Sequence, residues 1–235
     1  MVALIILCNN SYAQESGVSW DFPVKPGSDK WKSLKNSYEK IKICQIPDNI
    51  LFDLSTDHLI DICLEYPLLL DILAFNNILE GLSKYENDFN GFRELLNRYD
   101  AASVLLQKYV VTNPLNFKEN WESFEMGDIA MRLSMIELFL SHVRILSKMS
   151  HEEKKLLMSE YRIKKEQKSS KKELYHELCI QTIDLGIINL LQSENINLEE
   201  SIDMESVILY ITRGVLLSPN VKVQIDNALL SYLSN

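Results

Sequence analysis

The sequence predicts an all-α protein, an irregular array of about nine or ten helices packed as antiparallel pairs, with an extended N-terminal arm. Glycine is scarce, with 7 in 235 residues, which is under half of its usual share of about 7%. From Ser28 onward, apolar residues recur every three or four positions, the spacing of amphipathic helices. No constant repeat of about 34 to 47 residues accompanies this pattern, so we expect an irregular array and not a regular solenoid.

An extended arm at 14–27 precedes the first helix. Two prolines and two glycines disfavour a helix there, and Trp20 and Phe22 are expected to pin the arm to the body, because large aromatic side chains gain most from burial. Ser28 can cap the helix that follows. The apolar face of that helix consists of four residues at helical spacing: Trp31, Leu34, Tyr38 and Ile41.

Prolines and polar caps divide the next part of the chain. Pro47 ends the first helix or starts a short helical turn through Leu54. Ser55 or Thr56 can cap another helix, which stops near Pro67, since the residue before a proline avoids helical backbone. The remaining helices of this half are expected at about 67–84, 91–98 and 101–111.

The second half continues the same pattern after a connecting loop at 112–123. We expect a single helical domain over 28–235, and this loop is the candidate boundary between two layers. A helix at about 124–147 carries an apolar stripe through Leu133 and Val143 and a polar stripe that includes Ser134, Glu137 and Ser141. Further helices are expected at about 150–166, 171–192, 201–213 and 219–233, the first of them starting in a capping box formed by Ser150 and Glu153.

Residues 1–13 have the pattern of a cleaved export signal. An apolar run at 2–8 precedes small residues at 11 and 13, which places cleavage between Ala13 and Gln14. No basic residue precedes Lys25, so the basic start of such a signal is missing and we expect the true start codon upstream. A short buried strand is the alternative interpretation.

The predicted location follows from this leader. Seven apolar residues are far fewer than the roughly 20 that cross a bilayer, so we expect no transmembrane segment in the mature chain. Lipid attachment at Cys8 is disfavoured, because the residues just before it are large. The mature protein is therefore expected to be periplasmic or secreted.

Charge disfavours a nucleic-acid partner. The chain has 33 acidic and 24 Lys and Arg residues, a formal net charge of −9, whereas phosphate binding draws on clustered cations. One basic stretch, at 162–172, contains Glu166 and has acidic neighbours on both sides. We interpret this stretch as a solvated helix end and linker.

Four stretches between Trp20 and Tyr109 carry a family resemblance. They are WDFPVKPGSDKW, CQIPDNILFDLST, CLEYPLLLDILAFNN and NDFNGFRELLNR. Over residues 20–109 the chain resembles an uncharacterised family of exported, mainly helical proteins from gut Bacteroidetes. The resemblance implies export and a helical fold, and it implies no established activity.

Cysteines leave two alternatives open. Cleavage would leave Cys44, Cys63 and Cys179. Cys44 closes one predicted helix and Cys63 lies in the next, so a helical hairpin could bring them within bonding reach in an oxidising compartment. The alternative is two free thiols that pack as small apolar groups.

Polar residues in apolar helices are weak candidates for a site. Asp71 and Asn76 interrupt an apolar predicted helix, where burying a polar group without a hydrogen-bond partner is costly. These two side chains therefore either line a polar pocket or cross-link neighbouring helices. We favour the cross-link, with Arg93 as one candidate partner. Glu173 and His176 match one E-x-x-H element of a di-iron site, but no second element exists. We therefore assign no catalytic, cofactor-binding or metal-binding residue.

The sequence favours a non-catalytic helical binding module in the bacterial envelope, with an unknown protein or glycan as partner. The motifs of common hydrolases and of phosphate-binding loops do not occur. The alternative is a small envelope hydrolase or lyase that uses Asp and Glu side chains from separate helices, because carboxylates are plentiful and their separation cannot be known from sequence.

Overall fold

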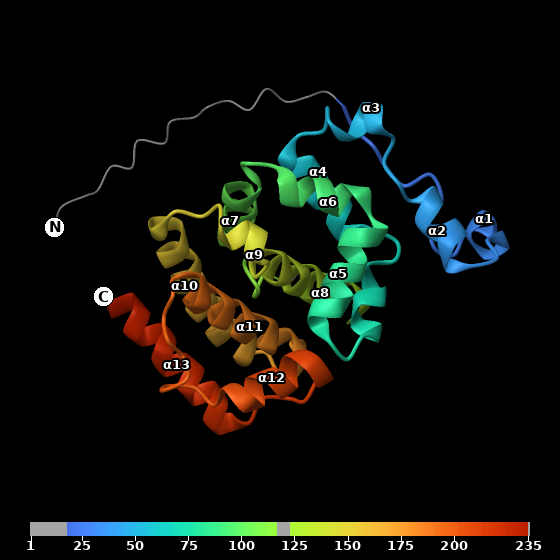
Figure 1. Ribbon diagram of the computed structural model, residues 1–235. Coiled ribbons are helices and arrows are strands. Elements are labelled where there is room, and N and C mark those ends of the chain that lie inside the picture. The colour runs from blue at the N-terminus through green and yellow to red at the C-terminus, as the bar shows by residue number, and fades with distance from the viewer. Residues whose placement is uncertain (1–17, 117–122, 235) are drawn as a thin grey trace.

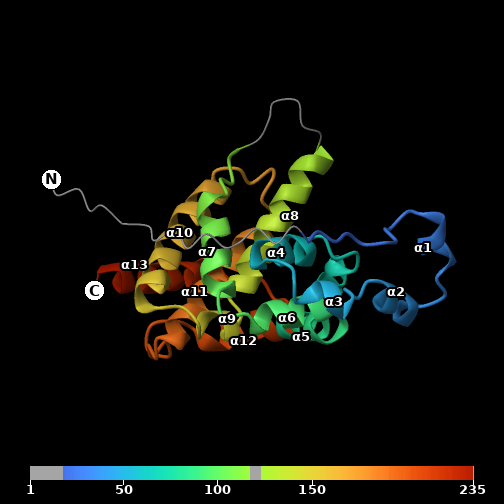
Figure 2. The ribbon, with the colours of Figure 1, turned by 90° about the horizontal axis from the view of Figure 1, so that it is seen from above.

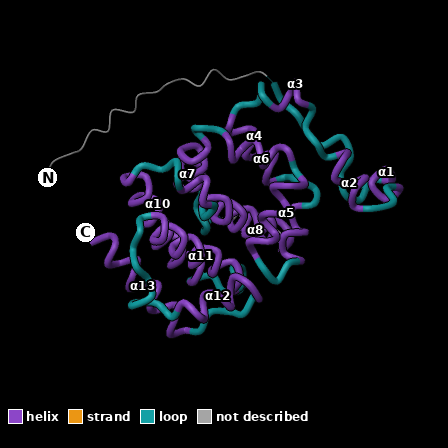
Figure 3. The backbone as a smooth tube through the Cα atoms, in the orientation of Figure 1, coloured by secondary structure: helices purple, strands orange, loops and turns teal. Residues whose placement is uncertain are grey.

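The computed structural model describes residues 18–116 and 123–234. These residues form thirteen α-helices and one 3-10 helix, η1, and contain no strand (Figure 3). Ten of the α-helices have seven or more residues. The all-α prediction is confirmed.

The helices follow one another with short connections. The first half contains α1 (Asp29–Ser33), α2 (Ser37–Ile43), α3 (Asp48–Leu51), α4 (Thr56–Leu64), η1 (Leu69–Ala74), α5 (Ile78–Asp88), α6 (Asn90–Asn97) and α7 (Ala101–Val111). The second half contains α8 (Ser123–Leu140), α9 (Val143–Leu146), α10 (His151–Ser169), α11 (Glu177–Ser193), α12 (Met204–Arg213) and α13 (Pro219–Ser234).

Helices α8 and α11 pack against each other and form the centre of the molecule (Figure 1). Helices α4 and α7 contact α8, and α10 and α13 contact α11. Every residue is buried over 133–140 of α8 and over 180–188 of α11, as expected of helices that are apolar nearly all round. Helices α1 and α2 lie at the margin, away from this centre (Figures 1 and 2).

The described part of the arm is anchored by aromatic side chains. Phe22 is buried, and its ring centroid lies 6.1 Å from that of Tyr66 and 5.9 Å from that of Phe89. Trp20 meets Phe22 edge-on and is half-buried against the core. Aromatic pairs of this kind add to the stabilisation from apolar burial, so the arm is attached to the body by the residues that the sequence indicated.

Several helix starts lie where the sequence places them. The Ser28 hydroxyl accepts a hydrogen bond from the Trp31 backbone N–H at the start of α1. Ser150 and Glu153 form the predicted capping box at the start of α10. Such caps satisfy N–H groups that have no partner within the helix.

Three predicted helices are interrupted, and each break has the same cause. Asn36, Asn77 and His142 each accept a hydrogen bond from a backbone N–H two or three residues later, and so start α2, α5 and α9. A side chain that bonds to the local backbone in this way competes with continuation of the preceding helix. The breaks turn Tyr38 and Val143, which were expected to face inward, to the surface, where they are 72% and 70% exposed.

The polar stripe predicted on α8 is buried at Ser134, Glu137 and Ser141. Ser134 and Ser141 each donate a hydrogen bond to a backbone carbonyl of α8. Glu137 is fully buried, and its carboxylate lies 2.7 Å from the Nζ of Lys168, which is also fully buried. Tyr109 and Thr182 donate further hydrogen bonds to the same carboxylate.

The basic stretch on α10 is also less solvated than expected. Lys164 and Lys168 are buried within it. Lys164 donates to the Thr112 carbonyl, at 2.8 Å, and Lys168 donates to the Cys179 carbonyl, also at 2.8 Å. Long basic side chains can bury their alkyl stems in this way while the charged end finds an acceptor.

Cationic side chains complete the C-terminal ends of several helices. Arg98 donates to the carbonyls of Leu51 and Leu54 at the end of α3, and Lys148 donates to those of Leu96 and Arg98 at the end of α6. Lys164 does the same for α7. The last carbonyls of a helix have no partner within it, and glycine, the residue that most often ends helices, is scarce here.

No helix in the described part of the chain combines the length and the apolar character that crossing a membrane requires.

Candidate functional site

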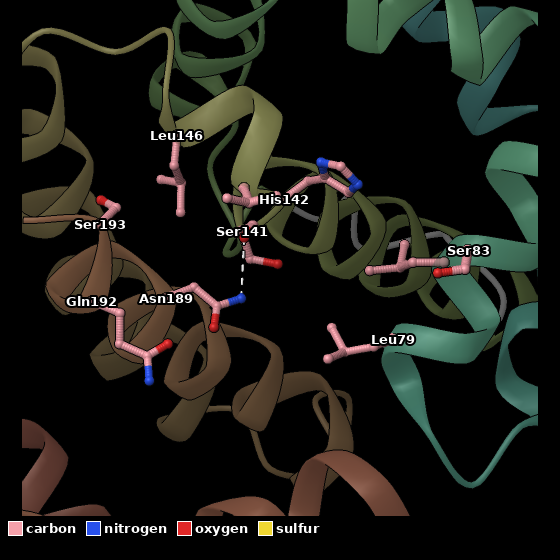
Figure 4. A pocket seen from close by; sticks show the side chains of 10 residues that line it. Leu79, Ser83, Ser141, His142, Leu146, Asn189, Gln192 and Ser193 are labelled. Atoms are coloured by element: carbon pink, nitrogen blue, oxygen red, sulfur yellow. Dashed lines mark hydrogen bonds between the residues drawn. The ribbon is translucent and has the colours of Figure 1, made fainter. Parts of the chain in front are cut away.

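A cavity of about 490 Å³ lies between α5, the α8–α9 junction and α11 (Figure 4). We name it the α5–α11 cavity. Helix α5 supplies three lining residues, the junction and α9 supply four, and α11 supplies three. They are Leu79, Leu82, Ser83, Ser141, His142, Val143, Leu146, Asn189, Gln192 and Ser193.

The break between α8 and α9 shapes this cavity. His142 Nδ1 accepts a hydrogen bond from the Arg144 backbone N–H, at 3.2 Å, and so caps α9. Asn189 Nδ2 donates to the Ser141 carbonyl, at 3.1 Å, which the end of α8 leaves without a helical partner (Figure 4). A local cap and a bond to α11 therefore hold the junction in place.

The cavity carries no charge at neutral pH. None of its ten lining residues is Asp, Glu, Lys or Arg, although 24% of the chain is charged. Burial lowers the pKa of His142 below its usual value of 6.5, and this effect outweighs the opposite effect of Glu86. Because Nδ1 accepts a hydrogen bond, the neutral imidazole carries its proton on Nε2.

Two walls of different character face the cavity. Leu79 and the buried Leu82 form an apolar wall on α5. Leu146 of α9 is also buried, and Figure 4 places it beside Ser193, on the other side of the cavity from Leu79. Asn189 and Gln192 extend from α11 (Figure 4). Within the described residues, the Gln192 amide, the Ser83 hydroxyl and the Asn189 side-chain carbonyl make no hydrogen bond, so these groups can bind a ligand.

A second concave surface, of about 680 Å³, lies between the arm, the segment from α4 to η1 and the first half of α8. It contains the carboxylates Asp21, Glu65 and Asp128. Asp21 pairs with Lys25 at 2.6 Å, and Glu65 lies 3.7 Å from Arg132. The hydrogen bond from Lys25 lowers the pKa of Asp21, which is the opposite of the shift that a general acid requires.

The structure does not bring the weak polar candidates together. Asp71 and Asn76 are exposed, so the cross-link expected from them is wrong. Arg93 is also exposed and donates to two backbone carbonyls between α5 and α6. His176 is exposed at the residue before α11, which begins later than predicted.

The arrangement of the described side chains favours neither a metal site nor a reactive cysteine. Within the described residues, no cluster of three or more His, Cys, Asp or Glu side chains is placed to hold a metal ion. Cys44 and Cys63 are buried free thiols, which is the second of the two alternatives. Burial raises the pKa of the Cys44 thiol to about 11, so it carries little of the reactive thiolate at neutral pH. The cleavage site at Ala13 and Gln14 lies outside the described residues.

Sequence reasoning missed the cavity. Its residues come from three separate segments of the chain, and the first and last of them, Leu79 and Ser193, are 114 positions apart. One signal was present: Asn189 and Gln192 interrupt an otherwise apolar run at the end of α11. No protein-family model, curated protein or solved structure matches the chain, so its function has to be inferred from the geometry of these residues.

Proposed function

We propose that the protein is a non-catalytic binding module, exported to the bacterial envelope, and that the α5–α11 cavity takes its ligand. The observation that carries this proposal is a set of lining groups without a hydrogen bond among the described residues, the Gln192 amide, the Asn189 side-chain carbonyl and the Ser83 hydroxyl, in the same cavity as the buried side chains of Leu82 and Leu146. Ligand sites are typically cavities of about 300–1,000 Å³ with mostly apolar walls and a few polar groups that fix orientation. The α5–α11 cavity has this size and this composition.

The chemistry of the cavity favours binding over catalysis. General acid–base catalysis needs a titratable group that can exchange a proton with the substrate. His142 is the lining residue that titrates nearest to neutral pH, and one of its two nitrogens is already used to cap α9. The remaining polar groups are amides and hydroxyls, which orient ligands by hydrogen bonds.

The alternative of a hydrolase or lyase rests on the carboxylates of the second concave surface. Asp21 and Glu65 both have cationic neighbours there. The hydrogen bond from Lys25 lowers the pKa of Asp21 and so makes it a poorer proton donor. This arrangement favours a structural role for Asp21.

Export is supported by the leader pattern at 1–13 and by the family resemblance over 20–109. A short apolar leader followed by small residues typically directs a protein to the periplasm or the cell exterior. The proposed partner is accordingly a molecule of the envelope or of the surroundings.

Thermal-shift measurements on the wild type and on Leu79→Trp test the proposal. Leu79 is 46% exposed at the rim, so an indole there should obstruct the cavity without disturbing the core. We expect a panel of capped peptides and neutral oligosaccharides to contain a ligand that raises the melting temperature of the wild type, since a ligand of the folded form stabilises it. The variant should lose that shift. Equal shifts in both proteins, or turnover of chromogenic ester or glycoside substrates by the wild type, would overturn the proposal.

A further inference from the structure

The exposed rim of the α5–α11 cavity is apolar. Leu79 is 46% exposed and forms, with the buried Leu82, the apolar wall on α5, and Val143 at the start of α9 is 70% exposed. Covering exposed apolar surface is favourable in proportion to its area. A ligand that gains from this wall has to offer aliphatic groups to it.

The opposite wall has the hydrogen-bonding pattern of a peptide unit. Asn189 and Gln192 are three residues apart on α11, so their side chains are neighbours on one face of the helix. A side-chain amide carries both an acceptor and two donors. The Gln192 amide is unpaired within the described residues, and Asn189 uses one donor on Ser141. These amides can therefore pair with main-chain N–H and C=O groups.

The charge of the cavity restricts the ligand further. With no charged lining residue and a neutral His142, an ionised ligand would lose hydration without gaining an ion pair. A saccharide is neutral, but it has hydroxyls around its ring, and the leucine wall would leave some of them without partners. Buried unpaired hydroxyls are costly. An aliphatic peptide segment satisfies both walls.

This inference rests on the proposed function: we propose that the α5–α11 cavity binds an uncharged peptide segment, with an aliphatic side chain against Leu79 and Leu82 and its main chain paired with the amides of Asn189 and Gln192. The partner is a protein that presents such a segment in an exposed tail or loop.

Titrations followed by ¹H–¹⁵N NMR test this inference. The probes are acetyl-Ala-Leu-Ala-amide, the same peptide with Asp or Lys in place of Leu, and maltotriose. We expect saturable shifts of the Asn189 and Gln192 side-chain signals with the leucine peptide, and at least tenfold weaker binding of the two charged peptides.

A matched pair of variants locates the binding. Leu79→Glu adds a charge at the rim, in the first turn of α5, where an acidic residue suits the helix. Leu230→Glu is the control, because Leu230 on α13 is also 46% exposed. We expect Leu79→Glu to weaken binding of the leucine peptide at least tenfold and Leu230→Glu to leave it unchanged.

The outcomes separate the two proposals. Binding of maltotriose but not of the leucine peptide, with loss in Leu79→Glu, would overturn the peptide inference and leave the binding module standing. Equal binding of all three peptides would also overturn the inference. Absence of binding by every probe would contradict both.

Discussion

Replacing Lys168 with methionine should destabilise the protein strongly. The Lys168 ammonium and the Glu137 carboxylate are both fully buried and lie 2.7 Å apart. Methionine retains most of the alkyl stem, so the main loss is the positive charge, and Glu137 keeps only the hydrogen bonds from Tyr109 and Thr182. Breaking a buried ion pair from one side lowers the free energy of unfolding by about 3–5 kcal/mol.

The expected change is large enough to measure by two methods. For a chain of this size, each kcal/mol lowers the melting temperature by roughly 2–4 °C, so Lys168→Met should melt about 6–20 °C below the wild type. Circular dichroism at 222 nm during heating, together with urea unfolding, gives both quantities. Lys84→Met is the control, because Lys84 pairs with Asp88 at the surface, where such pairs contribute about 0–1 kcal/mol.

A double variant separates the charge effect from packing. Removing both charges, as in Glu137→Leu with Lys168→Met, should restore much of the stability, because a buried ion pair is often replaced by apolar side chains without loss. A Lys168→Met variant that loses less than about 1 kcal/mol would show that the ammonium is not buried against Glu137, and it would refute the argument.

Three further predictions concern the cavity, the core and the leader. Burial lowers the pKa of His142 below 6.5, so the unfolded chain binds a proton at this imidazole more readily than the folded protein does, and the free energy of unfolding should decline as the pH falls from 6.5 toward the folded pKa. His142→Asn should flatten this decline. An NMR titration midpoint of His142 above pH 6.5 would contradict the prediction. Gly186→Ala should lower the free energy of unfolding by about 1–3 kcal/mol, because the new Cβ would lie 2.5 Å from the buried Tyr161 hydroxyl. Gly127→Ala is the control, because a Cβ there meets open space and should not destabilise the protein. Equal losses of stability for the two variants in urea unfolding would contradict the prediction. Mass spectrometry of the exported protein should find an N-terminus at Gln14, and a retained initiator methionine would exclude cleavage.

Local signals explain why most helices could be located from the sequence. Apolar spacing identifies a helix, and a polar cap such as Ser28 or Ser150 fixes its start through bonds to residues two or three positions away. The same local chemistry at Asn36, Asn77 and His142 was overlooked, and there the predicted helices were too long. Each of these breaks lay within reach of sequence reasoning.

The buried ion pair of Glu137 and Lys168 and the α5–α11 cavity could not be predicted from the sequence, for a different reason. Glu137 and Lys168 lie 31 positions apart, and each alone has the appearance of a solvated residue. Only the packing of α8, α10 and α11 makes them partners. The cavity likewise depends on a bond between Ser141 and Asn189, 48 positions apart, which no local pattern specifies.

The cationic ends of α3, α6 and α7 have a consequence for how the chain folds. Arg98, Lys148 and Lys164 complete these helices from positions 44 to 52 residues later in the chain. A fragment that ends before α8 would keep Arg98 but lack Lys148 and Lys164, which complete α6 and α7. Such mutual dependence favours all-or-none assembly, in which fragments ending before α8 stay largely unstructured until the rest of the chain is supplied.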